Sequence, residues 1–291
     1  MQCRKWLLSF QCHQTKVLRP FRSLCMEAHF SERQTYTDIL RLSYTEIPEK
    51  RPTSVSNSKP PVIFLHGVLA SGTTYHSVLA RDNFVPDRRV YALDLRNHGS
   101  SPHSSVMNYK VFAEDVIRFL KDHGISRSVI IGHSMGGKVG MKVALEYPQL
   151  VSELVVVDLA PIDYSDPVFV KNLPTDAIVA MSKVNPESCT ERWQVDDLLK
   201  QNGVQNKRSM DKILESPVKI GQVYNGPTLF IRGERSIYVM NSAAEKAIRD
   251  FFPNAIIETI AGAGHWLTAE EPEKFCTVVN NFLYNTNLKI N

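Results

Sequence analysis

Gly132-His133-Ser134-Met135-Gly136 is the stretch of this chain that decides its fold. It directly follows the apolar run Ser128-Val129-Ile130-Ile131 and precedes a helix-like stretch at 138–147. The two glycines leave room for a backbone turn too tight for a side chain, and such a turn lifts the Ser134 hydroxyl clear of a sheet edge. The pattern therefore predicts a strand, a sharp turn that carries a serine, and a helix. The alternative is a connection that is small and flexible for packing reasons alone.

Continuous apolar runs recur along the chain on both sides of this turn. They are rich in β-branched residues and bounded by turn residues, as expected of strands buried on both faces. Helical patterns alternate with them, which predicts an α/β fold with a doubly wound, mostly parallel sheet. Function in such a sheet gathers at the carboxyl ends of the strands. The runs lie at 62–65, 90–93, 129–131, 154–157, 228–231 and 255–260, a half-exposed strand is predicted at 40–44, and the helices at 109–123, 138–147 and 243–252.

The composition bounds the class of protein. With 291 residues, of which 43% are hydrophobic and 22% charged, the chain is predicted to form one soluble domain and an additional segment. The net charge of +4 is only mildly basic and does not indicate a nucleic-acid-binding protein. The five cysteines are scattered, with no spacing suited to zinc, so free thiols and no metal or cofactor are expected. No run has the apolar length that a membrane helix needs.

The N-terminal segment is basic. Residues 1–26 contain five Lys or Arg residues and no acidic residue, and the first carboxylate is Glu27. This composition is typical of a mitochondrial presequence, with an unstructured basic tail as the alternative. We therefore predict a targeting segment over 1–35, a folded domain over 36–291, and a mitochondrial location, with a cytoplasmic location as the alternative.

The alternation of strand and helix breaks between Pro161 and Gly226. Short helices are predicted at 193–199 and 210–214, within polar sequence punctuated by prolines. An insertion of this size in a regular fold is usually a cap over the site. We predict a cap over about 162–226, with a plain surface excursion as the alternative.

A serine at its free pKa is a poor nucleophile, so Ser134 needs a base within hydrogen-bond reach and a carboxylate to orient that base. Among the nine histidines, His265 lies in the glycine-containing stretch 261–266, after the apolar run 255–260. It is therefore expected on a loop at the carboxyl end of a strand, late in the chain, as the order Ser, Asp or Glu, His requires. We predict His265 as the base.

Two carboxylates are candidates for the acid. Asp158 ends the run 154–157, which is the first predicted strand after the serine, and Glu234 follows the run 228–231, one strand further on. A buried strand that ends in a single aspartate has few reasons to do so other than catalysis or capping of the next turn. The residues favour Asp158, with Glu234 as the alternative.

The tetrahedral intermediate of acyl transfer carries an oxyanion, which needs hydrogen-bond donors. One donor is predicted to be the backbone N–H of Met135, directly after the serine. The second is predicted to be the backbone N–H of Val68, in the loop 66–71 that follows the run 62–65. Both donors belong to the main chain, so the identity of the side chain is almost irrelevant to this role.

A polar stretch at 94–99 follows the strand predicted at 90–93. Asp94 and Arg96 could form a local ion pair that fixes this loop. A role in binding the substrate is the alternative.

The chain resembles the α/β-hydrolases. Within them it is similar to the branch that holds small bacterial acyl-ester esterases, animal mitochondrial proteins of the abhydrolase-domain eleven type, and yeast ethanol or alcohol acetyltransferases. The resemblance covers about residues 40–285. It is carried by His66-Gly67, Asp94-Leu95-Arg96-Asn97-His98-Gly99-Ser100-Ser101, Gly132-His133-Ser134-Met135-Gly136-Gly137-Lys138, Val157-Asp158-Leu159-Ala160-Pro161 and Gly262-Ala263-Gly264-His265-Trp266.

The resemblance implies an acyl-enzyme on Ser134, with Asp158 rather than Glu234 as the acid. Water would resolve the acyl-enzyme in esterase or thioesterase activity, and an alcohol would resolve it in ester synthesis, with acetyl-CoA or another acyl-CoA as a substrate. A non-catalytic ligand-binding or interaction protein on the same fold is the third reading. The chain departs from this branch at Ala70, where a glycine is usual, and in the stretch 199–213, which is shorter than in relatives.

Overall fold

The computed structural model describes residues 39–51, 59–68, 70–164, 214–219, 221–239 and 242–285. Every helix and strand described here belongs to one unit, made of Leu40–Leu173 and Lys207–Asn291. The predicted targeting segment, the helix predicted at 193–199 and most of the predicted cap lie outside the described residues, as does the stretch 199–213. None of the helices in the described part of the chain has the length and apolar composition to cross a membrane.

A sheet of seven strands organises the described residues, in the order β1-β3-β2-β4-β5-β6-β7. Strand β1 runs antiparallel to β3, and the other neighbours are parallel, so the doubly wound, mostly parallel sheet predicted from the sequence is confirmed. The side chains of β2 to β5 are buried throughout, because helices cover both faces. The strands are β1 (Tyr44–Ile47), β2 (Val62–Leu65), β3 (Val90–Leu93), β4 (Ser128–His133), β5 (Val151–Val157), β6 (Thr228–Gly233) and β7 (Ala255–Ile260).

The first strand begins later than the alternating pattern at 40–44 predicts. It pairs Tyr44 with Leu93, the last residue of β3, so the chain before Tyr44 has passed the end of its partner strand. In the preceding backbone the Ser43 carbonyl accepts from the backbone N–H of Asp94 at 2.8 Å. The N–H groups there donate to side chains instead: that of Leu40 to Asp115 Oδ1 at 2.6 Å and that of Ser43 to Ser101 Oγ at 2.8 Å. The prediction of a strand at 40–44 is therefore wrong at its start and right only at its last residue.

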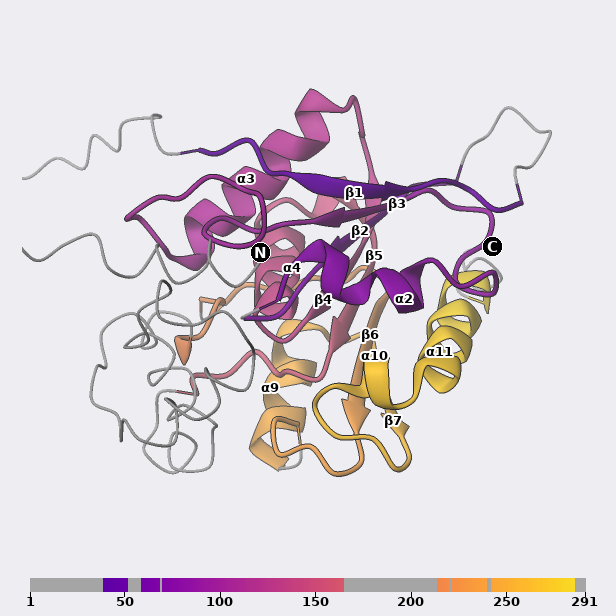
Figure 1. The fold of residues 1–291 in the computed structure, drawn as a ribbon. Helices are drawn as coiled ribbons and strands as arrows, with labels where there is room; N and C mark the ends of the chain where they lie inside the picture. Colours follow the sequence, from indigo (N-terminus) through magenta and orange to yellow (C-terminus); the bar gives the residue numbers. More distant parts are fainter. Residues whose placement is uncertain are drawn as a thin grey trace, which may run out of the picture. The chain divides into compact units, whose positions relative to one another are not determined.

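Helices form a layer on each face of the sheet (Figure 1). Residues of α3 (Tyr109–Asp122), α4 (Met135–Glu146) and α9 (Ser242–Phe251) pack in one hydrophobic cluster. Residues of α2 (His76–Leu79), α10 (Leu267–Glu270) and α11 (Pro272–Asn285) pack in a second. The strands supply alternate side chains to the two clusters, as the period of a β-strand requires. Two short 3₁₀ turns, η2 (Gly72–Tyr75) and η3 (Pro148–Leu150), complete the described elements.

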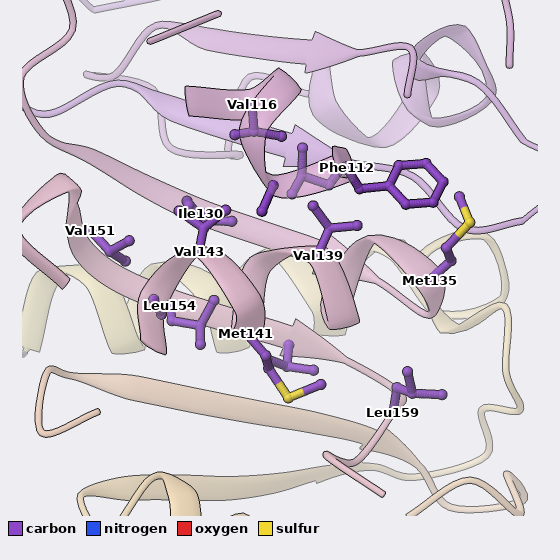
Figure 2. Close-up of a cluster of buried hydrophobic side chains, with 14 of the residues drawn as sticks. Phe112, Val116, Ile130, Met135, Val139, Met141, Val143, Val151, Leu154 and Leu159 are labelled. Carbon is purple, nitrogen blue, oxygen red and sulfur yellow. The ribbon is translucent and has the colours of Figure 1, made fainter. Parts of the chain in front are cut away.

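The cluster around α4 fixes the helix that follows the serine. Its side chains include Val139 and Val143 of α4 together with Ile130 and Leu154 of the sheet (Figure 2). Gly140 allows α4 to lie close to the sheet, since a Cβ there would meet the side chains of Ile130 at 3.0 Å and Leu154 at 3.2 Å. The helix therefore has a fixed position from which to present its first residues at the sheet edge.

Candidate active site

Ser134 occupies a sharp turn between β4 and α4, as the glycine pattern predicts. Its φ of 53° and ψ of −118° lie in a region that L-residues rarely adopt. The glycines permit this turn: a Cβ on Gly132 would lie 2.2 Å from the carbonyl oxygen of Gly136, and a Cβ on Gly136 would lie 2.2 Å from that of Leu65. The backbone N–H of Ser134 donates to the carbonyl of Val157 at 2.9 Å, which ties the turn to the end of β5.

His265 and Asp158 are in direct contact. Nδ1 of His265 lies 2.6 Å from Oδ2 of Asp158. Because a carboxylate only accepts hydrogen bonds, Nδ1 carries the proton and donates it, which leaves Nε2 free to take a proton. The Asp158 side chain is fully buried, whereas 21% of the His265 side chain is exposed. The pair therefore has a buried carboxylate and an imidazole with access to solvent.

Asp158 is held by two further donors. Its Oδ1 accepts from the backbone N–H of Gly233 at 3.0 Å, and its Oδ2 also accepts from the hydroxyl of Ser236. The backbone at Asp158 has a φ of 57°, and its N–H donates to the carbonyl of Ile231 at 2.7 Å. The strained turn at the end of β5 is thus fixed by β6 and by the loop that follows β6.

Glu234, the alternative acid, lies apart from the imidazole. Its side chain is exposed, and its Oε2 accepts from the backbone N–H of Gly262 at 2.8 Å. Glu234 therefore ties the loop after β6 to the loop after β7. The geometry pairs His265 with Asp158 instead.

The loop after β2 packs directly against the serine turn. A Cβ on Gly67 would lie 3.0 Å from Nδ1 of His133 and 3.4 Å from Cβ of Ser134, so glycine is needed there for close approach. Val68, whose N–H is a predicted oxyanion donor, is the next residue and is half-buried. Met135, the other predicted donor, begins α4, and the first N–H groups of a helix have no acceptor within the helix.

His66 shapes this loop as a neutral side chain. Its Nδ1 donates to the carbonyl of Gly67 at 2.7 Å, and its Nε2 accepts from the backbone N–H of Leu95 at 2.9 Å. Complete burial, together with the nearby His98, lowers the pKa of His66 to about 3. A neutral ring with one donor and one acceptor matches these two partners, so His66 fixes the turn.

The local ion pair predicted between Asp94 and Arg96 is wrong. Arg96 pairs with Asp115 of α3, with Nε at 2.7 Å and Nη2 at 2.8 Å from its two carboxylate oxygens. Asp94 instead accepts from the backbone N–H of Gly72 at 2.8 Å and of Ser100 at 2.8 Å. Arg96 points toward α3, whose Asp115 is distant in sequence, and spacing along the chain cannot reveal such a partner.

Four side chains around this constellation have no assigned role from the sequence. Ser236 donates to Asp158, and the ring of Tyr238 lies 4.3 Å from that of His265, between centroids. Tyr75 and His133 are hydrogen-bonded to each other at 2.7 Å. Position in the sequence could have revealed His133, which ends the strand before the serine, and Ser236, which follows the strand beside Asp158. Tyr75 and Tyr238 carry no comparable signal.

No metal centre competes with this constellation in the described part of the chain. Among those residues, no group of three or more His, Cys, Asp or Glu side chains could hold a metal ion. Cys276, in α11, is a free and buried thiol. Burial raises its pKa to about 11, which disfavours the reactive thiolate.

The sequence matches known proteins over most of its length. A family model described as the alpha/beta hydrolase fold matches residues 60–182. An sn-1-specific diacylglycerol lipase ABHD11 of Mus musculus is 33% identical over 77% of this chain and 81% of its own length. The chain belongs to the α/β-hydrolase family. Esterase YbfF of Escherichia coli is 30% identical to this α/β-hydrolase over 78% of the chain and 94% of the esterase.

Two further relatives agree with the branches expected of this α/β-hydrolase. A probable alcohol acetyltransferase of Saccharomyces cerevisiae is 33% identical over 77% of this chain and 77% of its own length. A solved structure of a marine microorganism esterase has a TM-score of 0.70 and 29% identity, and covers 84% of this chain and 99% of its own. Proteins named as esterases and lipases thus share this chain's fold and about a third of its residues over the matched lengths.

Proposed function

We propose that this protein is a serine hydrolase that forms an acyl-enzyme from acyl esters or thioesters. Ser134 is the nucleophile, His265 the base and Asp158 the acid that orients it. The observation that carries the proposal is the 2.6 Å contact between Nδ1 of His265 and Asp158, together with a serine on a strained turn whose backbone N–H is bonded to Val157, the residue before Asp158. The naming of several relatives as esterases or lipases supports it.

The proposed reaction has two halves. Oγ of Ser134 attacks the acyl carbonyl carbon, and its proton passes to Nε2 of His265 while Nδ1–H remains hydrogen-bonded to Asp158. The backbone N–H groups of Val68 and Met135 stabilise the oxyanion. The C–O or C–S bond then breaks, and the leaving alcohol or thiol takes the proton from His265.

Water resolves the acyl-enzyme in the second half. His265 removes a proton from the water, its oxygen attacks the acyl carbon, and the Ser134 ester bond breaks with return of the proton to Oγ. This sequence moves protons and acyl groups only, so it requires no cofactor. Small-molecule esters and thioesters, acyl-CoA included, are the proposed substrates.

A fluorophosphonate probe and an acyl series test the proposal. The probe should label the folded wild type and leave Ser134→Ala unlabelled, because it reacts with an activated serine. Turnover of p-nitrophenyl esters and acyl-CoA thioesters of increasing chain length would then define the acyl group. A folded wild type that is neither labelled nor active would contradict the proposal and favour a ligand-binding protein.

Ester synthesis is the second candidate function. The yeast relative named as a probable alcohol acetyltransferase favours it, and the same three residues would serve. An alcohol then replaces water as the second nucleophile, and His265 takes its proton. Acetyl-CoA supplied with and without ethanol separates the two: ethyl acetate indicates transfer, and acetate alone indicates hydrolysis.

The mitochondrial location is also a proposal, which rests on the composition of residues 1–26. Fusion of residues 1–35 to a fluorescent protein should direct the fusion to mitochondria. Replacement of the basic residues of that segment by glutamine should return it to the cytoplasm. A fusion that stays cytoplasmic with its basic residues intact would contradict the proposal.

A further inference from the structure

A buried pair of side chains lies beside the serine turn and has no role in the proposed reaction. Tyr75 comes from η2 and His133 is the last residue of β4. The Tyr75 hydroxyl lies 2.7 Å from Nδ1 of His133, and Nε2 of His133 lies 2.8 Å from the carbonyl oxygen of His265. Both side chains are buried, with 2% of Tyr75 and none of His133 exposed.

The direction of each hydrogen bond follows from its partners. A carbonyl oxygen only accepts, so Nε2 of His133 carries the proton and donates it to His265. Nδ1 of the neutral ring is then the acceptor, and the Tyr75 hydroxyl donates to it. The Tyr75 oxygen in turn accepts from the backbone N–H of Gly67 at 3.4 Å. Complete burial lowers the pKa of His133 to about 3, so the ring stays neutral near pH 7.

This chain of hydrogen bonds ends at the backbone of Gly67 and at the backbone of His265, and it passes through the side chain of His133. Each of these three residues takes part in the proposed reaction or directly precedes a residue that does. Gly67 precedes Val68, which supplies one oxyanion donor. His133 precedes Ser134, the nucleophile. His265 is the base, and its ring lies 4.8 Å from the ring of His133, between centroids. One side-chain pair therefore links the oxyanion loop, the serine turn and the base loop.

We propose that Tyr75 and His133 are positioning residues that hold the oxyanion loop and the His265 loop in register with Ser134. The inference rests on the proposed function and deepens it. Acyl transfer needs the nucleophile, the base and the oxyanion donors within about 0.5 Å of their productive places. Neither Tyr75 nor His133 forms a hydrogen bond to the Ser134 side chain or to the His265 ring among the described residues; they act through the backbone of Gly67 and His265.

A purely structural role for Tyr75 and His133 predicts a different result from a positioning role. If Tyr75 and His133 only filled the core, their loss would lower the melting temperature and leave the turnover of folded protein unchanged. If they hold the three loops in register, their loss lowers kcat and leaves KM nearly unchanged. The split between kcat and KM therefore separates the two roles.

Tyr75→Phe is the first test, because it removes one hydroxyl and keeps the ring beside Phe64, at 4.7 Å between centroids. We expect kcat for p-nitrophenyl acetate to fall about tenfold, with KM within about twofold, since the hydrogen bonds of the buried hydroxyl to His133 and from Gly67 are lost. The rate of labelling by a fluorophosphonate should fall in parallel.

Tyr224→Phe is the matched control. Tyr224 is also buried, and its hydroxyl donates to the carbonyl of Val151 at 3.3 Å, at the first residue of β5 and so at the opposite end of the sheet. It should lower the melting temperature by a similar amount and leave kcat unchanged. Equal kcat in wild type and in folded Tyr75→Phe would overturn the positioning role.

A pair of His133 variants tests the second link. His133→Gln places an amide N–H near the position of Nε2 and can still donate to His265, whereas His133→Asn reaches only the position of Nδ1. We expect Gln to retain about tenfold more kcat than Asn, at similar melting temperatures. A kcat of His133→Asn equal to or higher than that of His133→Gln would contradict the link to His265.

The outcomes for the wild type separate the two proposals. A wild type without turnover would overturn the proposed function and this inference with it, whereas an active wild type with unaffected variants overturns this inference alone.

Discussion

Nδ1 of His265 lies 2.6 Å from Oδ2 of Asp158, although 107 residues separate the two in the chain. The contact exists because β5 and β7 are both neighbours of β6, and parallel strands bring their carboxyl ends to one edge of the sheet. Asp158 is buried and accepts from Gly233 and Ser236 as well, so the imidazole meets a carboxylate with little freedom to turn.

Asp158→Asn should abolish most of the turnover of the proposed hydrolase. An amide at this position donates as well as accepts and no longer selects the imidazole tautomer with the proton on Nδ1. We expect kcat to fall on the order of 10⁴-fold, as for the loss of the equivalent role in a serine protease. Steady-state hydrolysis of p-nitrophenyl acetate measures it, with the melting temperature as a check on folding.

Glu234→Gln is the matched control for that variant. Its side chain is exposed and accepts from the backbone N–H of Gly262, which an amide oxygen can also accept. We expect kcat within about twofold of the wild type, because no reacting group depends on its charge. Normal turnover in Asp158→Asn with loss in Glu234→Gln would reverse the assignment of the acid.

Ser236→Ala should reduce both activity and stability. Its hydroxyl donates to the fully buried Oδ2 of Asp158, and a hydrogen bond to a charged group contributes about 1.5–3 kcal/mol. We expect kcat/KM to fall about tenfold or more and the free energy of unfolding to fall by an amount in that range. Urea unfolding and steady-state kinetics measure the two effects.

Ser152→Ala controls for the loss of a buried hydroxyl. Ser152 is buried in β5, and its Oγ has no hydrogen-bond partner among the described residues. Its replacement should be neutral or slightly stabilising, because no bond is broken. Equal losses in the two serine variants would show that Ser236 does not support Asp158.

The elements that carry the site could be predicted because their signals are local. The runs at 62–65, 90–93 and 255–260 coincide with β2, β3 and β7, since each is bounded by turn residues and covered on at least one face. The helix predicted at 138–147 begins earlier, at Met135, because Gly136 and Gly137 can enter a helix that packs on the sheet. Its start depends on tertiary packing, which overrides the weak helix propensity of glycine.

The partners of charged and polar side chains could not be predicted in the same way. Arg96 finds Asp115 on α3 rather than Asp94 two residues away, because the end of β3 directs its side chain toward that helix. Tyr75 reaches His133 from a short 3₁₀ turn whose sequence carries no sign of the contact. Such contacts are set by the order of strands in the sheet, which sequence periodicity does not specify.

Gly136→Ala should prevent folding or greatly reduce stability. A Cβ at this position would lie 2.2 Å from the carbonyl oxygen of Leu65 and 2.7 Å from that of His66, and backbone atoms such as these have little room to move. We expect a loss of about 3 kcal/mol or more in the free energy of unfolding, from overpacking. Circular dichroism and thermal unfolding of purified protein measure it.

Gly124→Ala distinguishes a close contact from backbone strain. Gly124 lies two residues after the end of α3 and has a φ of 65°, but a Cβ there would meet nothing within 4 Å. The cost should therefore be the left-handed conformation alone, about 1–2 kcal/mol. A larger loss in the free energy of unfolding for Gly124→Ala than for Gly136→Ala would contradict the close packing of the serine turn on β2.

Lys138 should make the stability of the protein rise with pH above neutrality. Its amino group is buried in α4 and donates to the carbonyls of Leu214 and Glu215, both at 2.7 Å. Burial lowers its pKa from 10.5 to about 7, although the charges of Asp163 and Glu215 oppose the shift. Between those two values the unfolded chain binds one proton more than the folded chain, so the free energy of unfolding increases with pH by up to about 1.4 kcal/mol per pH unit. Below about pH 7 both states are protonated, and this contribution is constant.

Lys138→Met should remove that slope. Urea unfolding of wild type and variant at several pH values from about 6 to about 9.5 gives the difference in the free energy of unfolding at each pH, which cancels the titration of other groups. Relative to the variant, the wild type should gain stability as the pH rises above about 7 and show no change below it. A difference that stays constant across the whole range would mean that Lys138 remains charged in the folded protein. A wild type that loses stability relative to the variant as the pH rises would contradict the direction of the pKa shift.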